Sequence, residues 1–399
     1  MRHAGSFVVT MMLAALPLYA CAAGEAIESD AGPPPVEGGT VQPTAADVHV
    51  NVRDGFVSEA QWMRSYGVSA LANGPDARAS FDRLNAAQAQ IVQQVAPFAG
   101  DDRAAQLNDL LHARAAAFAD LVTSINSHAS STVGDPQAAL DANAQQIGAF
   151  FAALCPNAFP SNGGDYLQAA NRSMVEGLRA NAGNDPAGGV EHFDDAQGSS
   201  VHFADLVGIG LSSTFHAELA PATTSRHDDD LEQALHVFFG DQVFWTRAYV
   251  VDHIADVATQ PELDRAVFAT VDLGNVLSSY FGETIGSQMQ GYIHTDTTDA
   301  LAFVFALETN DQNTIDAIST QWDADADTLA LYVSTEAGVD RNAAQRLLRA
   351  SVSRERAMIE AREAKQWDAE AANYQMVLES RNEFASLFAK SIAALPAQR

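Results

Sequence analysis

The chain has 399 residues and a formal net charge of −29, with 22 Lys and Arg against 51 Asp and Glu. This negative excess argues against nucleic acid and anionic membrane surfaces as partners, and it favours solubility and, weakly, cations. The two Cys exclude a disulfide framework if Cys21 is acylated or removed, because Cys155 is then alone. Cys155 precedes Pro156 at a predicted helix end, where an inert packing role is expected.

Residues 1–21 have the pattern of an export signal. A short positive region precedes the apolar stretch Phe7 to Ala20, which is too short to span a bilayer comfortably. Leu18-Tyr19-Ala20-Cys21 resembles the lipobox of bacterial lipoproteins. If that resemblance holds, Cys21 becomes the lipidated N-terminus, and the protein is expected in the periplasm or at the outer membrane. The alternative is an ordinary signal peptide that is cleaved at a neighbouring alanine.

Residues 22–46 are rich in Gly, Pro and acids, with Pro33-Pro34-Pro35 at the centre. A segment of this composition cannot bury a core, so we expect a disordered tether. No apolar run after the signal is long enough to cross a membrane. A membrane association is therefore expected only through an N-terminal lipid.

The rest of the chain is predicted to be all-α. Apolar residues recur three and four positions apart, and Gly, Pro and Asn interrupt them at regular intervals. The predicted helices are 57–72, 77–98, 102–127, 136–154, 165–181 and 198–213, followed by 231–258, 262–280, 283–308, 312–335, 341–365 and 367–394. The glycine-rich segment between Asn181 and Ser200 is predicted to be a flexible loop. Lengths and short connections favour up-and-down helical bundles.

The chain repeats itself with a period of 181 to 183 residues. The matched segments keep one order along the chain, which is the signature of an internal duplication. They include Trp62-Met63-Arg64-Ser65-Tyr66 with Trp245-Thr246-Arg247-Ala248-Tyr249, Leu111-His112 with Ile293-His294, Leu140-Asp141-Ala142 with Trp322-Asp323-Ala324, and His202-Phe203-Ala204 with Glu383-Phe384-Ala385. Residues kept in both copies are expected to serve the shared architecture. A specific site is expected where the copies diverge or meet.

These features predict five segments. They are a signal peptide over 1–21, a disordered tether over 22–46, a first helical bundle over 47–220, a linker over 221–230 and a second helical bundle over 231–399. Residues 341–399 hold ten basic and seven acidic residues, whereas the rest of the chain is strongly acidic. The last helices are therefore expected to dock against acidic ones.

The second copy resembles a group of small bacterial helical proteins of uncharacterised function. The resemblance covers roughly 231–395 and rests on Asp241 to Tyr249, Tyr292-Ile293-His294 and Trp322 to Ala326. It implies a single helical bundle for each copy and no established activity. The relatives often have His where this chain has Gln242, which puts any histidine site of theirs in doubt here.

The repeated Trp-x-Arg-x-Tyr motif is interpreted as structural. Trp62 and Tyr66, like Trp245 and Tyr249, are four residues apart and share one helix face, whereas the arginine between them points elsewhere. We therefore expect the aromatic residues to pack in the bundle. Arg64 and Arg247 are expected to pair with acids of neighbouring helices. A buried arginine beside aromatic residues could also hold an anionic ligand.

Histidines and acids suggest an alternative divalent-metal site. His112 and His294 occupy matched positions of the third helix in each copy, and Asp241 or Asp325 could approach His294 from other helices. Helical bundles hold transition metals with such residues. The Glu-x-x-His pairs of di-iron bundles are missing, so a capping or hydrogen-bonded histidine is the competing interpretation.

No sequence motif identifies a reaction. The chain has no Gly-x-Ser-x-Gly, no glycine-rich phosphate loop and no Ser-x-x-Lys. We therefore expect no catalytic residues and no cofactor, and the leading prediction is an exported cell-envelope protein that binds a small molecule or a protein partner. A groove between the copies is the expected binding surface. The alternatives are the metal-binding bundle and, third, an enzyme.

Overall fold

The computed structural model describes residues 42–127, 135–221, 226–255, 257 and 260–394. The expected signal peptide, Cys21 and nearly all of the tether lie outside these residues. The described residues form twelve α-helices and one short 3₁₀ helix, with no β-strand among them, which confirms the all-α prediction. No helix in this part of the chain has both the length and the apolar character needed to cross a bilayer.

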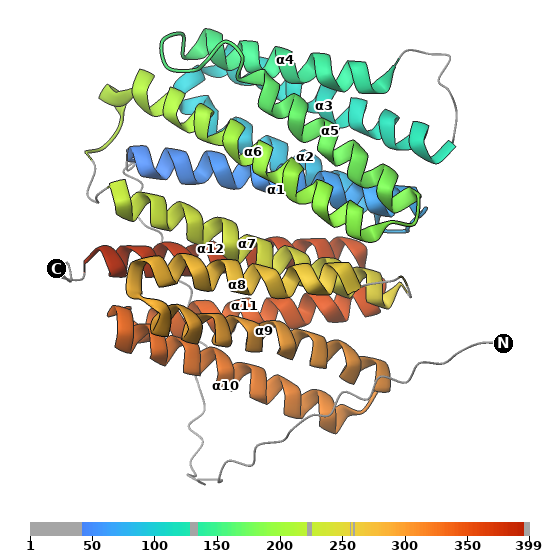
Figure 1. Ribbon diagram of the computed structural model, residues 1–399, viewed down its shortest axis with the longest axis vertical. Coiled ribbons are helices and arrows are strands. Elements are labelled where there is room, and N and C mark those ends of the chain that lie inside the picture. The colour runs from blue at the N-terminus through green and yellow to red at the C-terminus, as the bar shows by residue number, and fades with distance from the viewer. Residues whose placement is uncertain (1–41, 128–134, 222–225, 256, 258–259, 395–399) are drawn as a thin grey trace. The chain divides into compact units, whose positions relative to one another are not determined.

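Each copy contributes six consecutive helices (Figure 1). The first copy consists of α1 (Ala45–Leu71), α2 (Ala77–Ala99), α3 (Asp101–Ser127), α4 (Pro136–Leu154), α5 (Gly164–Ala182) and α6 (Pro186–Thr214). The second copy consists of α7 (Arg226–Ile254), α8 (Gln260–Phe281), α9 (Glu283–Thr309), α10 (Gln312–Ala337), α11 (Arg341–Glu363) and α12 (Trp367–Ala393). In both copies each helix packs against the next one, and the sixth packs back against the first.

The two copies form one compact unit from residue 42 onward. The first helices of the copies, α1 and α7, pack against each other, as the blue and yellow-green ribbons of Figure 1 show. Two further contacts are reciprocal, because α6 touches α8 and α12 touches α2. The copies therefore meet through equivalent helices, as a duplication that packs against itself would.

The helix α1 begins about three turns earlier than its sequence pattern predicts. Thr44 caps it, because the Thr44 side chain accepts a hydrogen bond from the Asp47 amide at 3.1 Å and the Thr44 amide donates to Asp47 Oδ2 at 2.8 Å. This reciprocal capping box satisfies two backbone donors at the helix start. The first turns also bury Val48 and Val52, which share one helix face.

The prediction of a flexible loop between Asn181 and Ser200 is wrong. Asp185 and Pro186 begin α6, with the Asp185 side chain accepting from the Gly188 amide at 3.0 Å. The glycines allow close helix packing: a Cβ added at Gly177 of α5 would lie only 3.1 Å from the Gly189 carbonyl oxygen. Glycine therefore permits contact between α5 and α6 here and does not end the helix.

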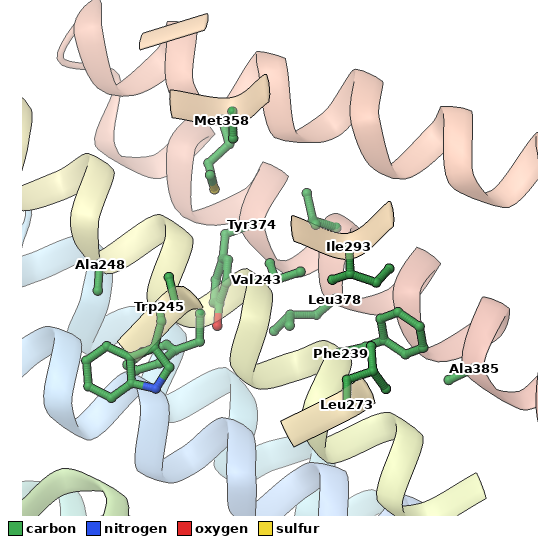
Figure 2. Close-up of a cluster of buried hydrophobic side chains, with 14 of the residues drawn as sticks. Phe239, Val243, Trp245, Ala248, Leu273, Ile293, Met358, Tyr374, Leu378 and Ala385 are labelled. Atoms are coloured by element: carbon green, nitrogen blue, oxygen red, sulfur yellow. The ribbon is translucent and has the colours of Figure 1, made fainter. Parts of the chain in front are cut away.

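Several of the residues that recur between the copies lie in the core, whereas the recurring His112 and His294 are exposed. Trp62 is 1% exposed and Trp245 0%, and Leu111, Ile293 and Trp322 are fully buried. In Figure 2 the Trp245 indole lies beside the blue ribbon of the first copy, apart from the group around Phe239 and Leu378. The repeated aromatic residues thus reach the boundary between the copies.

Each bundle also contains a buried polar network. The third helices of the two copies carry opposite charges at matched positions, Arg114 in α3 and Asp296 in α9. In the first copy, Arg114 of α3 donates to Glu59 of α1 at 2.8 Å. In the second, Asp296 of α9 accepts from Trp322 Nε1 at 2.8 Å and from Arg381 of α12 at 2.5 Å. Duplicated polar positions have therefore acquired separate partners.

Glu355 of α11 shares its only ion-pair partner among the described residues, Arg381, with a second acid, Asp296. It is fully buried, its ion pair with Arg381 is 3.7 Å long, and Arg381 already bonds Asp296. Burial, reinforced by Asp296 and opposed by Arg381, raises the pKa of Glu355 to about 8. The folded protein therefore holds this proton at pH values where the unfolded chain has lost it.

Replacing Glu355 by Gln is expected to raise the melting temperature at pH 8 and to change it little at pH 5. A raised carboxyl pKa costs stability that grows as the pH rises from the unfolded pKa to the folded one. The Gln variant removes that cost. Melting temperatures of both proteins between pH 5 and pH 8.5 test this, and a constant difference across the range would refute it.

Candidate functional site

The repeated motifs join the two copies by reciprocal cation–π contacts. The Arg64 guanidinium lies 4.7 Å from the ring centre of Trp245, and the Arg247 guanidinium lies 4.9 Å from that of Trp62. Each arginine therefore stacks on the tryptophan of the other copy. Such contacts strengthen when they are removed from water, and all four side chains are buried.

Each arginine near this boundary also has an acid partner. Arg64 pairs with Glu262 of α8 at 3.2 Å, and Arg362 pairs with Asp76 at 2.6 Å, both across the copies. Arg247 pairs with Glu370 of α12 at 2.6 Å within its own copy. The side chains of these six residues are at most 7% exposed. A fixed, charge-balanced floor therefore lies between the bundles.

A pocket of about 480 Å³ opens above this floor. Its walls come from both copies: the end of α1 and the turn into α2, the ends of α3, α5, α7 and α11, and the starts of α6 and α8. About half of the wall residues are apolar, among them Val68, Leu71, Ile125, Ala248 and Val251, and the surface that lines the pocket is mostly apolar. An apolar pocket with a few convergent polar groups is the usual form of a small-molecule site. We refer to it as the inter-copy pocket.

Asp252 is the one acid in the inter-copy pocket without a direct partner among the described residues. It is half-buried on α7, and its side-chain carboxylate makes no hydrogen bond or ion pair within the part of the chain that the structure describes. Burial raises its pKa to about 7 against the opposing charge of Arg64, and Glu262 adds to the increase. Asp252 is therefore the charge in this pocket that a ligand could still neutralise.

Two further polar atoms of the floor have unused bonding capacity. Glu262 Oε2 and Arg64 Nε are buried and have no hydrogen-bond partner in the described structure. Glu262 is 2% exposed and Arg64 5%. Because buried polar atoms are almost always hydrogen-bonded, these two atoms favour an occupant that brings hydrogen-bonding groups into the pocket.

The four candidate metal ligands do not gather. His112 and His294 are exposed, and His112 bonds Asn108 at 3.1 Å. Asp241 is buried, where it accepts hydrogen bonds from Gln197 and Arg265, and Asp325 accepts from Gln321 on its own helix. Among the described residues, no group of three or more His, Cys, Asp or Glu is placed to hold a metal ion.

Burial shifts the pKa of two residues that the sequence analysis singled out, Asp241 and Cys155. It raises the pKa of Asp241 to about 7 despite Arg265, and it raises the pKa of the Cys155 thiol. Cys155 is buried at the end of α4. A thiol that is kept protonated and away from solvent is a poor nucleophile.

Sequence reasoning missed the acids that complete the pocket. Asp76, Asp252 and Glu262 lie on three different elements, and the packing of α1 against α7 and of α7 against α8 brings them together. One local signal was present: Asp252 lies three residues after Tyr249 of the repeated motif. The corresponding residue of the first copy is Ser69, so the acid is specific to the second copy.

Comparison of the chain with models of known protein families, with curated proteins and with solved structures gave no match. The geometry of the pocket is therefore the basis for a functional proposal.

Proposed function

We propose that this is an exported cell-envelope protein that binds a small ligand between its two helical bundles. The ligand has an apolar body and an ammonium group, and the role is binding and not catalysis. The observation that carries the proposal is Asp252: its carboxylate has no direct partner among the described residues, and it lies in a pocket with a mostly apolar lining surface above a charge-balanced floor.

The charges favour an ammonium group over a carboxylate. Arg64, Arg247 and Arg362 are already paired with acids, so an anionic ligand would have to compete with these pairs. An ammonium group would instead neutralise Asp252 and approach Glu262. The net charge of −29 also draws cations toward the protein.

Hexylammonium is expected to bind saturably, about tenfold or more tightly than hexanol or hexanoate. Calorimetric titration of the three compounds at pH 8 measures this. All three compounds share an apolar chain, so tighter binding of the amine indicates an interaction of its ammonium group with the carboxylate of Asp252. The Asp252→Asn variant is expected to lose the preference, because it keeps the shape of the side chain and removes its charge.

Asp264→Asn is the matched control, since Asp264 is an exposed acid on α8 outside the pocket. It should bind hexylammonium as the unaltered protein does. Equal affinity for the three compounds would contradict the proposal, and so would an unchanged preference in Asp252→Asn.

The envelope location rests on residues 1–21. Metabolic labelling with a lipid precursor is expected to mark the protein, and Cys21→Ser is expected to abolish the label. A labelled Cys21→Ser protein, or no label on the unaltered chain, would remove the lipoprotein proposal. An unlabelled protein recovered from the periplasm would favour the ordinary signal peptide.

A further inference from the structure

A second cleft lies between the copies and shares no lining residue with the inter-copy pocket. It has a volume of about 370 Å³ and is formed by α1 and α2 of the first copy with α7 and α12 of the second. This volume is within the range of about 300–1,000 Å³ typical of small-molecule sites. We call it the amide cleft, because seven of its lining residues are Asn or Gln.

The amide cleft is polar but carries little charge. Among the described residues that line it there is no Lys or Arg, and the acids are Asp54 and Glu379. Asp54 is already engaged, since its Oδ2 accepts from His236 Nδ1 at 2.8 Å and from Asn382 Nδ2 at 2.9 Å. Within the described part of the chain, the cleft therefore offers no Lys or Arg side chain to an anionic ligand. Asp54 is already hydrogen-bonded to residues of the second copy.

His236 holds this arrangement across the boundary. Its Nδ1 bonds Asp54 Oδ2 of the first copy at 2.8 Å, and its Nε2 bonds the Ser386 hydroxyl at 2.9 Å. Asp54 and His236 line the cleft, whereas Ser386 does not. This chain of bonds therefore positions the Asp54 side chain and does not present a nucleophile to the cleft.

Several polar atoms of the lining residues have no partner in the described structure. Gln61 accepts the Tyr374 hydroxyl at 3.0 Å through Oε1, and its Nε2 is left without an acceptor although the residue is 1% exposed. Ser58 Oγ, Gln94 Oε1 and Asn382 Oδ1 are likewise buried without partners. Donors and acceptors are thus both unused, which is rare for buried groups.

A glycine opens the space. Gly240 lies in the middle of α7 and lines the cleft, and a Cβ added there would meet no atom within 4 Å. Glycine inside a helix is destabilising relative to alanine. The helix therefore carries a residue that weakens it at a point where a side chain would enter the cleft.

We propose that the amide cleft binds an uncharged, hydroxyl-rich ligand of the neutral saccharide class. A sugar hydroxyl both donates and accepts, and amide side chains offer the same two functions at fixed positions. The unused donor of Gln61 and the unused acceptors of Gln94 and Asn382 match such a ligand. The absence of a lining cation, among the described residues, disfavours an anionic one.

Saturation-transfer NMR with maltose, N-acetylglucosamine and glucuronate tests this proposal. The full-length protein is expected to give a saturable signal with at least one of the neutral sugars and a weaker one with glucuronate. Gly240→Leu, which places a side chain in the cleft, is expected to weaken the binding about tenfold or more. Gly291→Leu is the matched control, because Gly291 is exposed on α9 and a Cβ there also meets no atom within 4 Å.

Gln94→Leu keeps the test decisive if Gly240→Leu does not fold. It removes an acceptor that has no partner, so the fold should persist while sugar binding weakens. The proposal is supported if a neutral sugar binds saturably, if each folded cleft variant weakens that binding, and if Gly291→Leu retains it. No saturable binding of either neutral sugar would overturn it and leave the cleft to ordered water. Unchanged binding in folded Gly240→Leu or Gln94→Leu would overturn it as well.

Discussion

Replacing Arg247 by Met is expected to lower the free energy of unfolding by about 3–5 kcal/mol, the cost of breaking a buried ion pair from one side. Arg247 donates to both carboxylate oxygens of Glu370, at 2.6 and 3.1 Å, and Glu370 is 1% exposed. Methionine fills a similar volume and leaves that carboxylate buried without its partner. The change also removes the guanidinium from the rings of Trp62 and Tyr374. Urea unfolding followed by tryptophan fluorescence measures the difference.

Two comparison variants identify the cause. Arg349→Met removes an arginine of similar ion-pair geometry, since Arg349 bonds Asp327 at 2.5 Å, but its side chain is 49% exposed. An exposed pair contributes about 1 kcal/mol or less, so this variant should be nearly neutral. The double variant Arg247→Met, Glu370→Met should recover much of the lost stability, because no charge is then left buried alone. If Arg247→Met costs no more than Arg349→Met, the burial of Glu370 does not make its pairing with Arg247 important for stability.

The affinity for hexylammonium is expected to fall roughly 30-fold between pH 8 and pH 5.5, given a carboxyl pKa of about 7 at Asp252. The carboxylate form that pairs with an ammonium group predominates above this pKa and is replaced by the neutral acid below it. An alkylammonium group stays charged throughout this range. The change in affinity therefore follows Asp252 and not the ligand.

The surroundings of Asp252 set this window. Arg64 on α1 and Arg362 on α11 lower its pKa, whereas burial, Glu262 on α8 and Asp76 raise it. Calorimetric titrations at half-unit steps of pH measure the profile. Asp252→Asn should give weak binding that does not change with pH, while Asp264→Asn should keep the full profile. An affinity that is constant or rises toward pH 5.5 would exclude Asp252 as the partner of the ammonium group.

Some helix boundaries were predictable from local sequence signals. The segment 136–154 is helical as predicted, because Asp135 and Pro136 begin it and Cys155-Pro156 follow it. The same criteria failed at Gly188 and Gly189, where glycine permits α5 and α6 to pack closely. Composition alone does not distinguish a glycine that loosens a chain from one that allows contact. That distinction depends on the neighbouring helix.

The sequence predicted where a pocket between the copies lies but not which residues line it. The duplication led us to expect a groove where the copies meet, and the inter-copy pocket lies there. Its acids lie on elements that sequence does not bring together: Asp76 ends the α1–α2 turn, Asp252 lies on α7 and Glu262 on α8. The paired histidines drew attention because their type suggests metal binding, yet His112 and His294 are exposed. The resemblance of the second copy to small bacterial helical proteins stays a prediction.

The central claim is that Asp252 receives a ligand ammonium group in the pocket between the copies. A crystal structure of the protein with hexylammonium tests it most directly. The claim predicts the nitrogen within ion-pair distance of the Asp252 carboxylate, with the alkyl chain along Val68 and Val251. An empty pocket in crystals that contain hexylammonium, or an amine bound only at exposed acids elsewhere, would contradict it.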